Sequence, residues 1–351
     1  VWNYNTMSEE TISSLGEFGI INRIAERFEN QNESTVKGIG DDAAVIDCGE
    51  KYQLISTDCL MEAIHFDLRY VPLKHLGFKA VAVNVSDIAA MNGTPKQITV
   101  NLGISPRFTL EAIDELYEGI KLACEAYKVD LVGGDTSSSP SGLFISISVL
   151  GEVEKTDVVY RNGAKENDII CVTGDLGGAY IGLNILEREK EVFLENDKVQ
   201  PQLDDHSYTV GRQLKPEARM DIIYDLKDFG VIPSSMIDIS DGLASELYHI
   251  TSQSKCGAVI YEDKIPVSDK TYKTAVDVFK IDPITCMMNG GEDYELLFTI
   301  KQEDYEKIKN HPDISVIGYI QPEKEGLNLI TKGDQVVPIT AQGWNHISSK
   351  K

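Results

Sequence analysis

Several common features are missing from this chain, and each absence narrows what the protein could be. No apolar run approaches the ~18 residues that a membrane-spanning helix needs, and no signal peptide is recognisable. The six cysteines are scattered without a CxxC pair, which argues against a zinc or iron–sulfur site and favours reduced cysteines. We therefore expect a cytoplasmic protein without a membrane partner.

Basic residues are also in short supply. The 33 lysines and arginines are outnumbered by 56 aspartates and glutamates, which leaves a formal net charge of −23. A nucleic-acid binder normally carries a basic stripe, and an anionic membrane would repel such a surface. We expect no nucleic-acid partner, and a phosphate-bearing ligand would have to be held by something other than a lysine and arginine cluster. Divalent metal ions are the obvious means.

The familiar signatures of nucleotide and hydrolase sites are missing too. The sequence contains no GxxxxGK[ST] phosphate loop, no GxGxxG after a strand, no GxSxG and no HExxH. The stretch from Gly174 to Gly182 comes near a dinucleotide loop but has the wrong spacing. Its glycines could serve close packing of a strand on a helix, or its backbone amides could meet an anion at the start of that helix.

The length of 351 residues predicts two domains. Residues 1–155 alternate short apolar runs with Gly/Asp turns and contain two strong helical patterns, Leu76 to Gly93 and Thr109 to Tyr127. This is typical of an α+β domain with a largely antiparallel sheet. Residues 156–351 open with a buried strand, a Gly-rich turn and a helix, which predicts an α/β domain. Val1 to Thr6 precede a Met and are interpreted as an added extension.

The most informative residues are carboxylates beside Gly, Ser or Thr, mostly at the end of an apolar run. Asp87 stands out because it lies inside an apolar helical pattern, where an unpaired charge would cost several kcal/mol. A divalent cation could be its partner. Six motifs show the pattern: "GIGDDAA" (Asp41, Asp42), "ISTDCL" (Ser56, Thr57, Asp58), "NVSDIAAM" (Ser86, Asp87), "VGGDTSS" (Asp135), "IDISDGL" (Asp238, Ser240, Asp241) and "NGGEDYELLF" (Glu292, Asp293).

These ligand types fit one class of metal. Carboxylate and hydroxyl oxygens without Cys or His clusters favour Mg²⁺, Mn²⁺ or Ca²⁺ over zinc. The motifs span about 250 residues, so they are typical of a site assembled by the fold, not of a local calcium loop. For each motif alone an ordinary turn remains an alternative. Asp238, Ser240 and Asp241 could likewise cap a helix that starts near Asp241.

Further segments complete an ordered series along nearly the whole chain. In order they are "LGEFGII", "GIGDDAAV", "STDCLMEAIHF", "KAVAVNVSDIAAM", "GGDTS", "YRNGAKENDII", "IDISDGL", "GGEDYELLF" and "GW". In order and spacing this series resembles the thiamine-monophosphate kinase family, within the superfamily of aminoimidazole ribonucleotide synthetase. It runs from about Leu15 to Trp344, and residues 187–206 are its least similar part.

The resemblance implies a fold and a reaction. The fold is a two-domain α/β (α+β) arrangement like that of aminoimidazole ribonucleotide synthetase, in which the N-terminal sheets of two subunits close into one barrel across a homodimer. The C-terminal α/β domain would close the active-site cleft. The reaction is ATP-dependent phosphorylation of thiamine phosphate to thiamine diphosphate, assisted by several Mg²⁺ ions. Another ATP-using enzyme of the same superfamily, or a non-catalytic protein that binds divalent cations, remains an alternative.

The resemblance also assigns residues. It implies no general base, because the acceptor phosphate is already anionic, and places Asp42, Asp58 and Asp87 at the centre. Asp41 would be a neighbour or only a turn residue. Alternatively, Arg161 would be a surface arginine, His65 an ordinary half-buried histidine, and Trp344 a tail residue that packs on the core. The implied contacts are Asp42, Ser56, Thr57, Asp58, Asp87, Asp135, Asp238 and Asp241 with Mg²⁺; Tyr117, Gly134, Asp135, Arg161 and Ser240 with ATP; and His65, Glu292 and Trp344 with thiamine phosphate.

Overall fold

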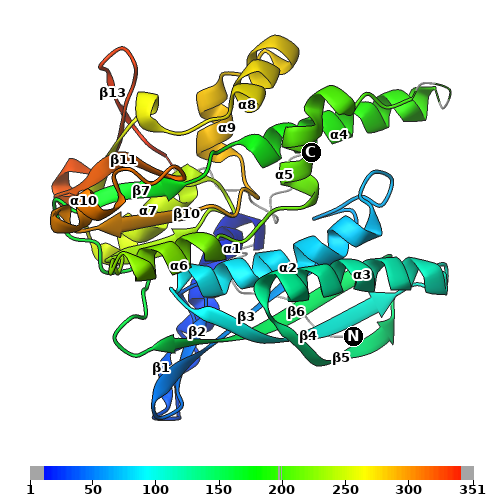
Figure 1. Cartoon of the computed structure of the whole chain (residues 1–351), viewed down its shortest axis with the longest axis horizontal. Helices are drawn as coiled ribbons and strands as arrows, with labels where there is room; N and C mark the ends of the chain where they lie inside the picture. Colours follow the sequence, from blue (N-terminus) through cyan, green and yellow to red (C-terminus); the bar gives the residue numbers. More distant parts are fainter. Residues whose placement is uncertain (1–11, 197, 199, 341–351) are drawn as a thin grey trace, which may run out of the picture.

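Two β-sheets, with helices between and around them, make up the chain (Figure 1). The coordinates are a computed structural model that describes residues 12–196, 198 and 200–340. The first part contains α1 (Ile12–Ala25), β1 (Thr35–Lys37), β2 (Ala44–Asp47), β3 (Lys51–Met61), α2 (Leu73–Ala90), β4 (Thr94–Ile104), α3 (Leu110–Tyr127), β5 (Asp130–Ser138) and β6 (Phe144–Glu154). The second part contains β7 (Ile169–Thr173), α4 (Gly178–Glu195), α5 (Ser207–Leu214), α6 (Met220–Asp228), β8 (Ser235–Asp238), α7 (Leu243–Ser254), β9 (Gly257–Tyr261), α8 (Asp269–Lys273), a π-helical turn (Thr274–Phe279), α9 (Pro283–Asn289), β10 (Leu296–Ile300), α10 (Tyr305–Ile308), β11 (Ile314–Gln321), β12 (Leu327–Ile330) and β13 (Val336–Pro338).

The first sheet has six strands in the order β1-β2-β3-β6-β4-β5. The β4–β5 neighbours are parallel and the others antiparallel. Helices α2 and α3 cover one face of this sheet (Figure 1). The other face is open, because alternate residues of β3, namely Ile55, Thr57, Cys59 and Met61, are exposed. The alternation of side chains along a strand therefore divides β3 into a covered face and a bare face.

Helix α2 crosses α3 at two glycines. A Cβ on Gly77 would lie 2.0 Å from the carbonyl oxygen of Leu116, and a Cβ on Gly119 would lie 1.9 Å from that of Lys74. Only a residue without a side chain lets the two backbones approach this closely. The N-cap of α3 is Thr109, whose hydroxyl accepts from the Ala112 amide at 3.2 Å. The helix predicted from Thr109 to Tyr127 is therefore confirmed.

The second sheet has seven strands in the order β13-β12-β9-β11-β7-β10-β8, with β12 and β9 parallel and the other neighbours antiparallel. Its two faces enter different hydrophobic clusters. Ile170 and Val172 of β7 pack in a cluster with residues of α7. Cys171, between them, joins a second cluster that includes residues of α6 and α2. The sheet is thus covered on both faces.

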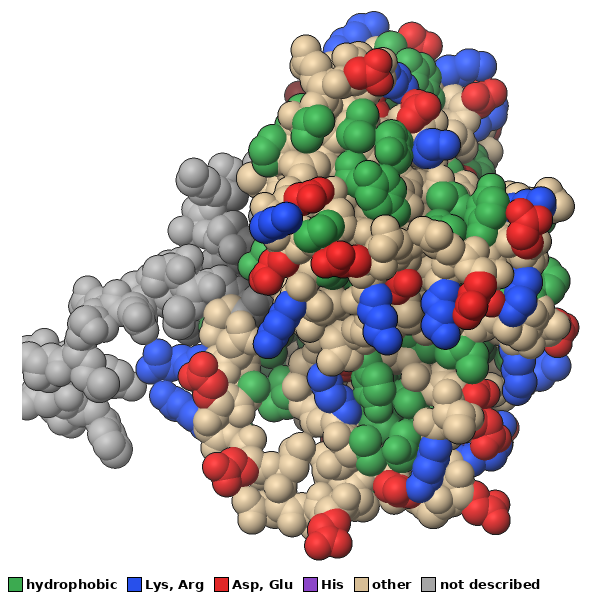
Figure 2. Space-filling view, turned by 90° about the vertical axis from the view of Figure 1, so that its left-hand side faces the viewer, with side chains coloured by type: hydrophobic (Ala, Val, Ile, Leu, Met, Phe, Trp, Pro, Cys, Tyr) green, Lys and Arg blue, Asp and Glu red, His purple; other side chains and the backbone are tan. Residues whose placement is uncertain are grey.

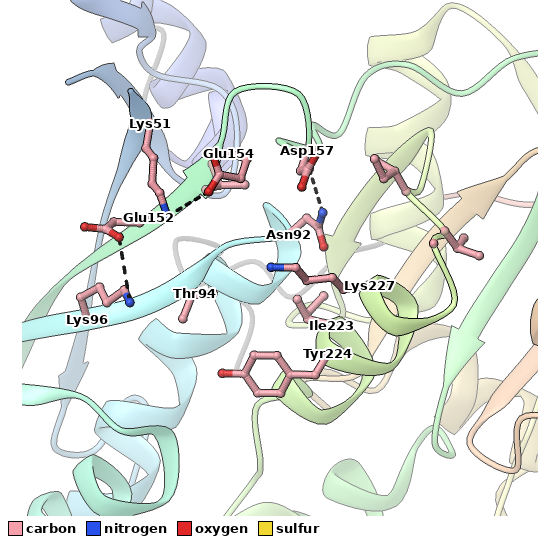
Figure 3. A pocket seen from close by; sticks show the side chains of 14 residues that line it. Lys51, Asn92, Thr94, Lys96, Glu152, Glu154, Asp157, Ile223, Tyr224 and Lys227 are labelled. Carbon is pink, nitrogen blue, oxygen red and sulfur yellow. Dashed lines mark hydrogen bonds and ion pairs between the residues drawn. The ribbon is translucent and has the colours of Figure 1, made fainter. Parts of the chain in front are cut away.

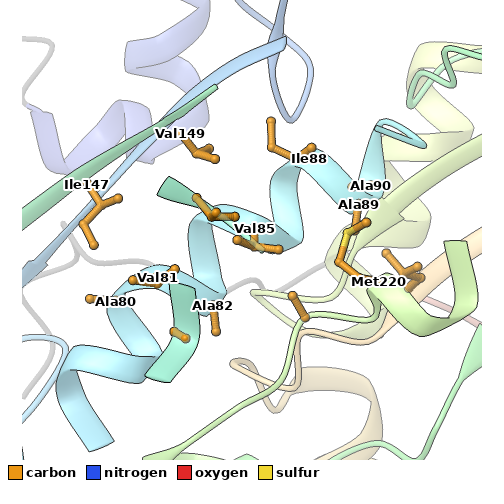
Figure 4. Packing of buried hydrophobic residues seen from close by; sticks show 14 of the residues in the cluster. Ala80, Val81, Ala82, Val85, Ile88, Ala89, Ala90, Ile147, Val149 and Met220 are labelled. Atoms are coloured by element: carbon orange, nitrogen blue, oxygen red, sulfur yellow. The ribbon is translucent and has the colours of Figure 1, made fainter. Parts of the chain in front are cut away.

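Helix α2 lies between the two sheets and is the common core element. Fourteen of its residues are buried. Figure 4 shows apolar ones among them, including Val81, Val85 and Ile88, between Ile147 and Val149 of β6 on one side and Met220 at the start of α6 on the other. The same hydrophobic cluster contains Met236 of β8 and Phe298 of β10. The two sheets are therefore joined through one continuous core. The prediction of two domains with mixed α and β content is confirmed, whereas the boundary between residues 155 and 156 stays a prediction.

The surface carries both signs of charge. On the face shown in Figure 2, lysines and arginines alternate with aspartates and glutamates, with hydrophobic side chains between them. In the described part of the chain no helix is both long enough and apolar enough to cross a membrane. The segment Val1 to Thr6 and Trp344 lie outside the described residues.

Candidate functional site

Three carboxylates from distant segments meet where the two sheets face each other across α2. They belong to Asp42, before β2, to Asp87 in α2, and to Asp238 at the end of β8. One carboxylate oxygen of each lies within 4.8 Å of the others, and Asp42 and Asp238 are buried. These are three of the residues that the sequence predicts as metal ligands. The group is called the acid cluster below.

Hydroxyl groups hold two of these carboxylates in place. The Ser56 hydroxyl of β3 donates to Asp87 at 2.5 Å, and the Ser86 hydroxyl of α2 donates to Asp238 at 2.6 Å. Ser86 belongs to one of the six sequence motifs, but the sequence assigns it no role. Each hydroxyl thus binds one oxygen of its carboxylate.

Strand alternation decides which part of the "STD" motif joins the cluster. Asp58, two residues after Ser56, lies on the same face of β3, and its backbone amide donates to Asn84 of α2 at 3.0 Å. Thr57 lies on the opposite, open face. Its hydroxyl donates to the carbonyl oxygen of Ile147 at 3.0 Å and accepts from Ser148 at 3.1 Å. The structure therefore brings Ser56 and Asp58 to the site but directs the Thr57 hydroxyl away from it.

The cluster is electrostatically costly as it stands. Burial raises the pKa of Asp58, Asp87 and Asp238 above the ordinary value of 3.8, and the nearby charge of Asp42 raises each of them further. Like charges in a site of low dielectric disfavour ionisation of one another. A cation among these oxygens would reverse that effect, which is the expected behaviour of a metal site.

One arginine already faces the cluster. The Arg161 guanidinium donates to both oxygens of Asp42, from Nη2 at 2.6 Å and from Nε at 3.2 Å. Its backbone amide donates to Asp41 at 3.0 Å, and Lys37 lies 3.5 Å from the same carboxylate. Asp41 thus fixes the segment that carries Arg161. The Arg161 side chain is only 20% exposed, so the alternative of an ordinary surface arginine is not supported.

A glycine occupies the N-cap of helix α7. The helix begins at Leu243 after Gly242, which has a φ of 115° and no side chain to act as a cap. Instead the Asp241 amide donates to Glu246 at 3.0 Å. None of Asp238, Ser240 and Asp241 therefore stands at the N-cap position of this helix, which is the alternative considered for them. Glu246 is buried, and the sequence reasoning did not single it out.

The "GGEDYE" segment gives each of its acids a different environment. Glu292 is bound by Lys79 of α2, with 2.8 Å between Nζ and Oε1. Asp293 accepts from the amides of Gly177 and Ala179, at 2.7 and 3.2 Å, where α4 begins. These two amides meet the protein's own carboxylate, so they do not serve as the external anion site considered for Gly174 to Gly182. Glu295 is bound by Arg212 and Arg219.

Glu292 lies next to the acid cluster through its backbone. Its amide donates to the carbonyl oxygen of Ser240 at 2.7 Å. The amide of Tyr294 likewise donates to the carbonyl oxygen of Ile239 at 2.9 Å. The loop that follows Asp238 and the loop that carries Glu292 are thus hydrogen-bonded to each other. Two groups of predicted site residues, which are about fifty positions apart in the sequence, therefore lie side by side.

Gly134 and Asp135 lie on the edge strand β5, away from the acid cluster within one chain. Strand register places Gly134 opposite Val100, Val100 opposite Ile147, and Ile147 opposite Asp58. Three inter-strand steps of about 4.8 Å amount to about 14 Å. Gly134 is required by close contact, since a Cβ there would lie 1.8 Å from the Val100 oxygen.

The remaining predicted contacts are dispersed. Tyr117 is half-buried on α3, which crosses α2 near Gly77, about ten residues and hence about 15 Å along the helix from Asp87. His65 lies in the loop after β3, where its Nδ1 accepts from the Met61 amide at 3.0 Å. Trp344 lies outside the described residues.

A cavity of about 310 Å³ lies elsewhere, at the end of α2 that leads into β4 (Figure 3). Two of its lysines are already paired, Lys51 with Glu154 at 2.9 Å and Lys96 with Glu152 at 3.9 Å. Lys51 is seven residues from Asp58 along β3, or about 23 Å. The carboxylates that suit phosphate chemistry are therefore not in this cavity.

Comparisons with known proteins agree with the geometry. The family model "AIR synthase related protein, N-terminal domain" matches residues 40–153, and "AIR synthase related protein, C-terminal domain" matches residues 165–328. A thiamine-monophosphate kinase of Buchnera aphidicola subsp. Schizaphis graminum is 37% identical over 337 residues, which cover 94% of this chain and 98% of the relative. The thiamine-monophosphate kinase of Bacillus subtilis is 35% identical and covers 95% and 99% of the two chains.

A solved structure shows the same similarity in three dimensions. It is described as AaThiL complexed with AMPPCP and TMP, and it matches with a TM-score of 0.80 at 31% identity. The match covers 98% of this chain and 100% of that chain. The similarity therefore extends over both sheets and is not limited to one half.

Proposed function

The chain belongs to the thiamine-monophosphate kinase family of AIR synthase related proteins, and from this membership we propose that it transfers the γ-phosphoryl group of ATP to thiamine phosphate. The products are thiamine diphosphate and ADP. One observation in the structure carries the proposal: the acid cluster of Asp42, Asp87 and Asp238 at the junction of the two sheets. A site rich in carboxylates suits a reaction in which metal-bound polyphosphates are brought together.

The proposed phosphoryl transfer does not require a general base. The acceptor oxygen of thiamine phosphate is already anionic near neutral pH, so no proton has to be removed to form the nucleophile. The main obstacle is repulsion between the acceptor phosphate and the triphosphate. Positioning in line and neutralisation of charge are what lower the barrier to phosphoryl transfer. We therefore assign no general base.

The acid cluster fits Mg²⁺ by the chemistry of its donors. The groups that could act as ligands are carboxylates and hydroxyls, which are the oxygen ligands that Mg²⁺ prefers. Bound Mg²⁺ would offset the negative charge of the phosphates and help to align them. Asp42, Asp58, Asp87 and Asp238 form the centre of this proposed site, with Ser56 and Asp241 beside them. Thr57 and Asp135 remain proposed ligands, although their side chains lie outside the cluster in the single chain.

Arg161 has a proposed role with the nucleotide. Its guanidinium is placed at the edge of the cluster by the Asp41 contact with its backbone, and its fork suits two phosphate oxygens as well as it suits Asp42. We propose that it contacts ATP, together with Ser240 of the β8–α7 loop. Tyr117, Gly134 and Asp135 are proposed nucleotide contacts from the resemblance. His65, Glu292 and Trp344 are the corresponding proposals for thiamine phosphate.

The open face of the first sheet supports a homodimer. Ile55 and Met61 are 38% and 46% exposed on this face, and Val132 of the edge strand β5 is 60% exposed. Apolar side chains exposed together often mark an interaction surface. We propose that the same sheet of a second subunit covers them and that the two sheets close into a barrel.

A direct assay tests the function. The purified chain is incubated with ATP, Mg²⁺ and thiamine phosphate, and thiamine diphosphate is sought by chromatography, with free thiamine as a parallel acceptor. We expect product from thiamine phosphate alone, and loss of product with EDTA. Product from neither acceptor, in a folded protein that still binds ATP, would keep the superfamily and reject this branch. Binding of Mg²⁺ without any dependence on ATP would favour a non-catalytic cation-binding protein.

A further inference from the structure

A buried lysine in α2, Lys79, has no role in the metal-assisted phosphoryl transfer proposed for the acid cluster. Lys79 is 3% exposed and lies between Phe78 and Ala80 on a helix whose neighbouring side chains are almost all apolar. A buried ammonium group is costly unless it is paired and hydrogen-bonded. The position is therefore one at which a simple core would carry an apolar residue, and the partners of Lys79 indicate why it does not.

Two groups from the second part of the chain receive the Lys79 ammonium. Its Nζ lies 2.8 Å from Oε1 of Glu292 and 3.3 Å from the backbone oxygen of Gln213 in α5. The side-chain amide of Gln213 donates in turn to Oε2 of Glu292. Each oxygen of Glu292 thus has one fixed partner. Lys79, Gln213 and Glu292 form a closed triad from three separate elements, which we call the Glu292 triad.

The backbone of Glu292 is fixed as well. Its φ is +64°, a conformation that residues other than Gly adopt at a cost. Its amide donates to Ser240, beside the acid cluster. The Glu292 side chain is nevertheless 27% exposed, whereas Lys79 is buried. A carboxylate oxygen has two acceptor positions, so Glu292 retains acceptor capacity toward the solvent side.

We propose that Lys79 is a positioning residue for thiamine phosphate, which acts by holding the Glu292 carboxylate oriented as a hydrogen-bond acceptor for an N–H group of the substrate's heterocycle. The inference rests on the proposed function. Lys79 already balances the charge of Glu292, so Glu292 selects the substrate by accepting a hydrogen bond and not by acting as an unpaired counter-charge. Gln213 supports the same orientation from the other side.

The test uses steady-state kinetics of the full chain with each substrate varied in turn. Lys79→Met should raise the KM for thiamine phosphate about tenfold or more, as expected when a charged hydrogen-bonding partner is lost, and leave the KM for ATP within about twofold. Lys79→Arg should recover part of the loss. Lys74→Met is the matched control: Lys74 is on the same helix, but it is solvent-exposed and lies 3.9 Å from Glu118. It should behave like the unsubstituted chain.

A double-mutant cycle separates positioning from packing. If Lys79 acts through Glu292, then Lys79→Met should add little to the effect of Glu292→Gln, whereas independent effects would multiply. Should Lys79→Met fail to fold, Gln213→Leu examines the same triad and should also raise the KM for thiamine phosphate alone.

The possible results are distinct. Multiplicative effects in the cycle, equal changes in both KM values, or an unchanged KM for thiamine phosphate in an active enzyme would each overturn the inference alone. An unsubstituted chain that forms no thiamine diphosphate would overturn the proposed function, and the inference with it.

Discussion

The Asp238 carboxylate is buried among other acids and receives a hydrogen bond from Ser86. An Asn side chain at this position keeps an oxygen that can accept the same bond but removes the charge. We expect Asp238→Asn to lower activity about a hundredfold or more, because a metal ligand is lost. Without metal its unfolding free energy should be unchanged within about 1 kcal/mol, or higher. Thermal melts in EDTA and isothermal titration with Mg²⁺ measure the two effects. A large loss of stability without metal would mean that Asp238 has a structural role.

The acid cluster also makes stability depend on pH. Burial raises the pKa of Asp238 to about 7 and that of Asp58 to about 6, from an ordinary value of 3.8. The folded chain therefore binds protons more tightly than the unfolded chain, so these groups add stability as the pH falls from about 7 toward about 4. With rising pH that contribution is lost.

The variant isolates this contribution from the other titrating groups. Between about pH 7.5 and 5.5, the unsubstituted chain in EDTA should gain stability relative to Asp238→Asn, by roughly 1 kcal/mol or more. Saturating Mg²⁺ should reduce the difference in slope, because the metal favours the ionised form. Parallel Tm curves for the two proteins in EDTA would contradict the assigned pKa shift.

For single residues, much of the candidate site can be predicted from the sequence. Asp87 can be named because a charge inside an apolar helical pattern needs a partner, whereas the metal roles of Asp42, Asp58 and Asp238 follow from the family resemblance. Lys79, inside the same apolar helix as Asp87, shows the same signal, and the sequence reasoning missed it. Thr57 is predicted as a metal ligand from the sequence, but the alternation of side chains along β3 places its hydroxyl on the opposite face from Ser56 and Asp58. Glu246 lies only five residues after Asp241 in the first turn of α7, which is a local signal that the sequence reasoning missed.

Among the structural elements, the α2–α3 crossing is the most sensitive to a small change. A methyl group on Gly119 would lie 1.9 Å from a backbone oxygen of α2, so the helices would have to separate. We expect Gly119→Ala to destabilise the fold by about 3 kcal/mol through overpacking, measured by chemical denaturation.

Gly211 of α5 provides the matched control. A Cβ there meets no atom within 4 Å. Gly211→Ala should stabilise the chain by about 0.5–1 kcal/mol, because Ala costs less backbone entropy in a helix. Equal effects of the two substitutions would contradict the crossing geometry.

The limits of a helix can be predicted from the local sequence more readily than its contacts with distant segments. The helix from Thr109 to Tyr127 has a capping Thr and a strong apolar period, and these predict its limits. The start of α4 is ambiguous in sequence, because its glycines suit a phosphate equally well. The partner of its amides, Asp293, comes from a segment more than a hundred residues later, and no local pattern reveals such a distant contact.

For the whole molecule, the open face of the first sheet leads us to predict a homodimer. In sedimentation velocity we expect the chain to behave as a dimer, with twice the subunit mass of 38.9 kDa. Ile55→Asp should shift it to the monomer, since a charge in an apolar interface is strongly unfavourable. Val336→Asp is the control, because Val336 is 64% exposed on β13 at the far edge of the second sheet. A dimer that survives Ile55→Asp would place the interface elsewhere.

Helix α2 carries both ends of the proposed acceptor site. Lys79, which holds Glu292, and Asp87, in the acid cluster, are eight residues apart on this one buried helix, or about 12 Å along its axis. The helix therefore sets the distance between Glu292, which we propose to bind the heterocycle, and the acid cluster, where we propose that the phosphoryl group is transferred. An acceptor with a longer or shorter linker between heterocycle and phosphate would contact either Glu292 or the acid cluster, but not both. We therefore expect selectivity for acceptor length to depend on this buried helix, through Lys79 and Asp87.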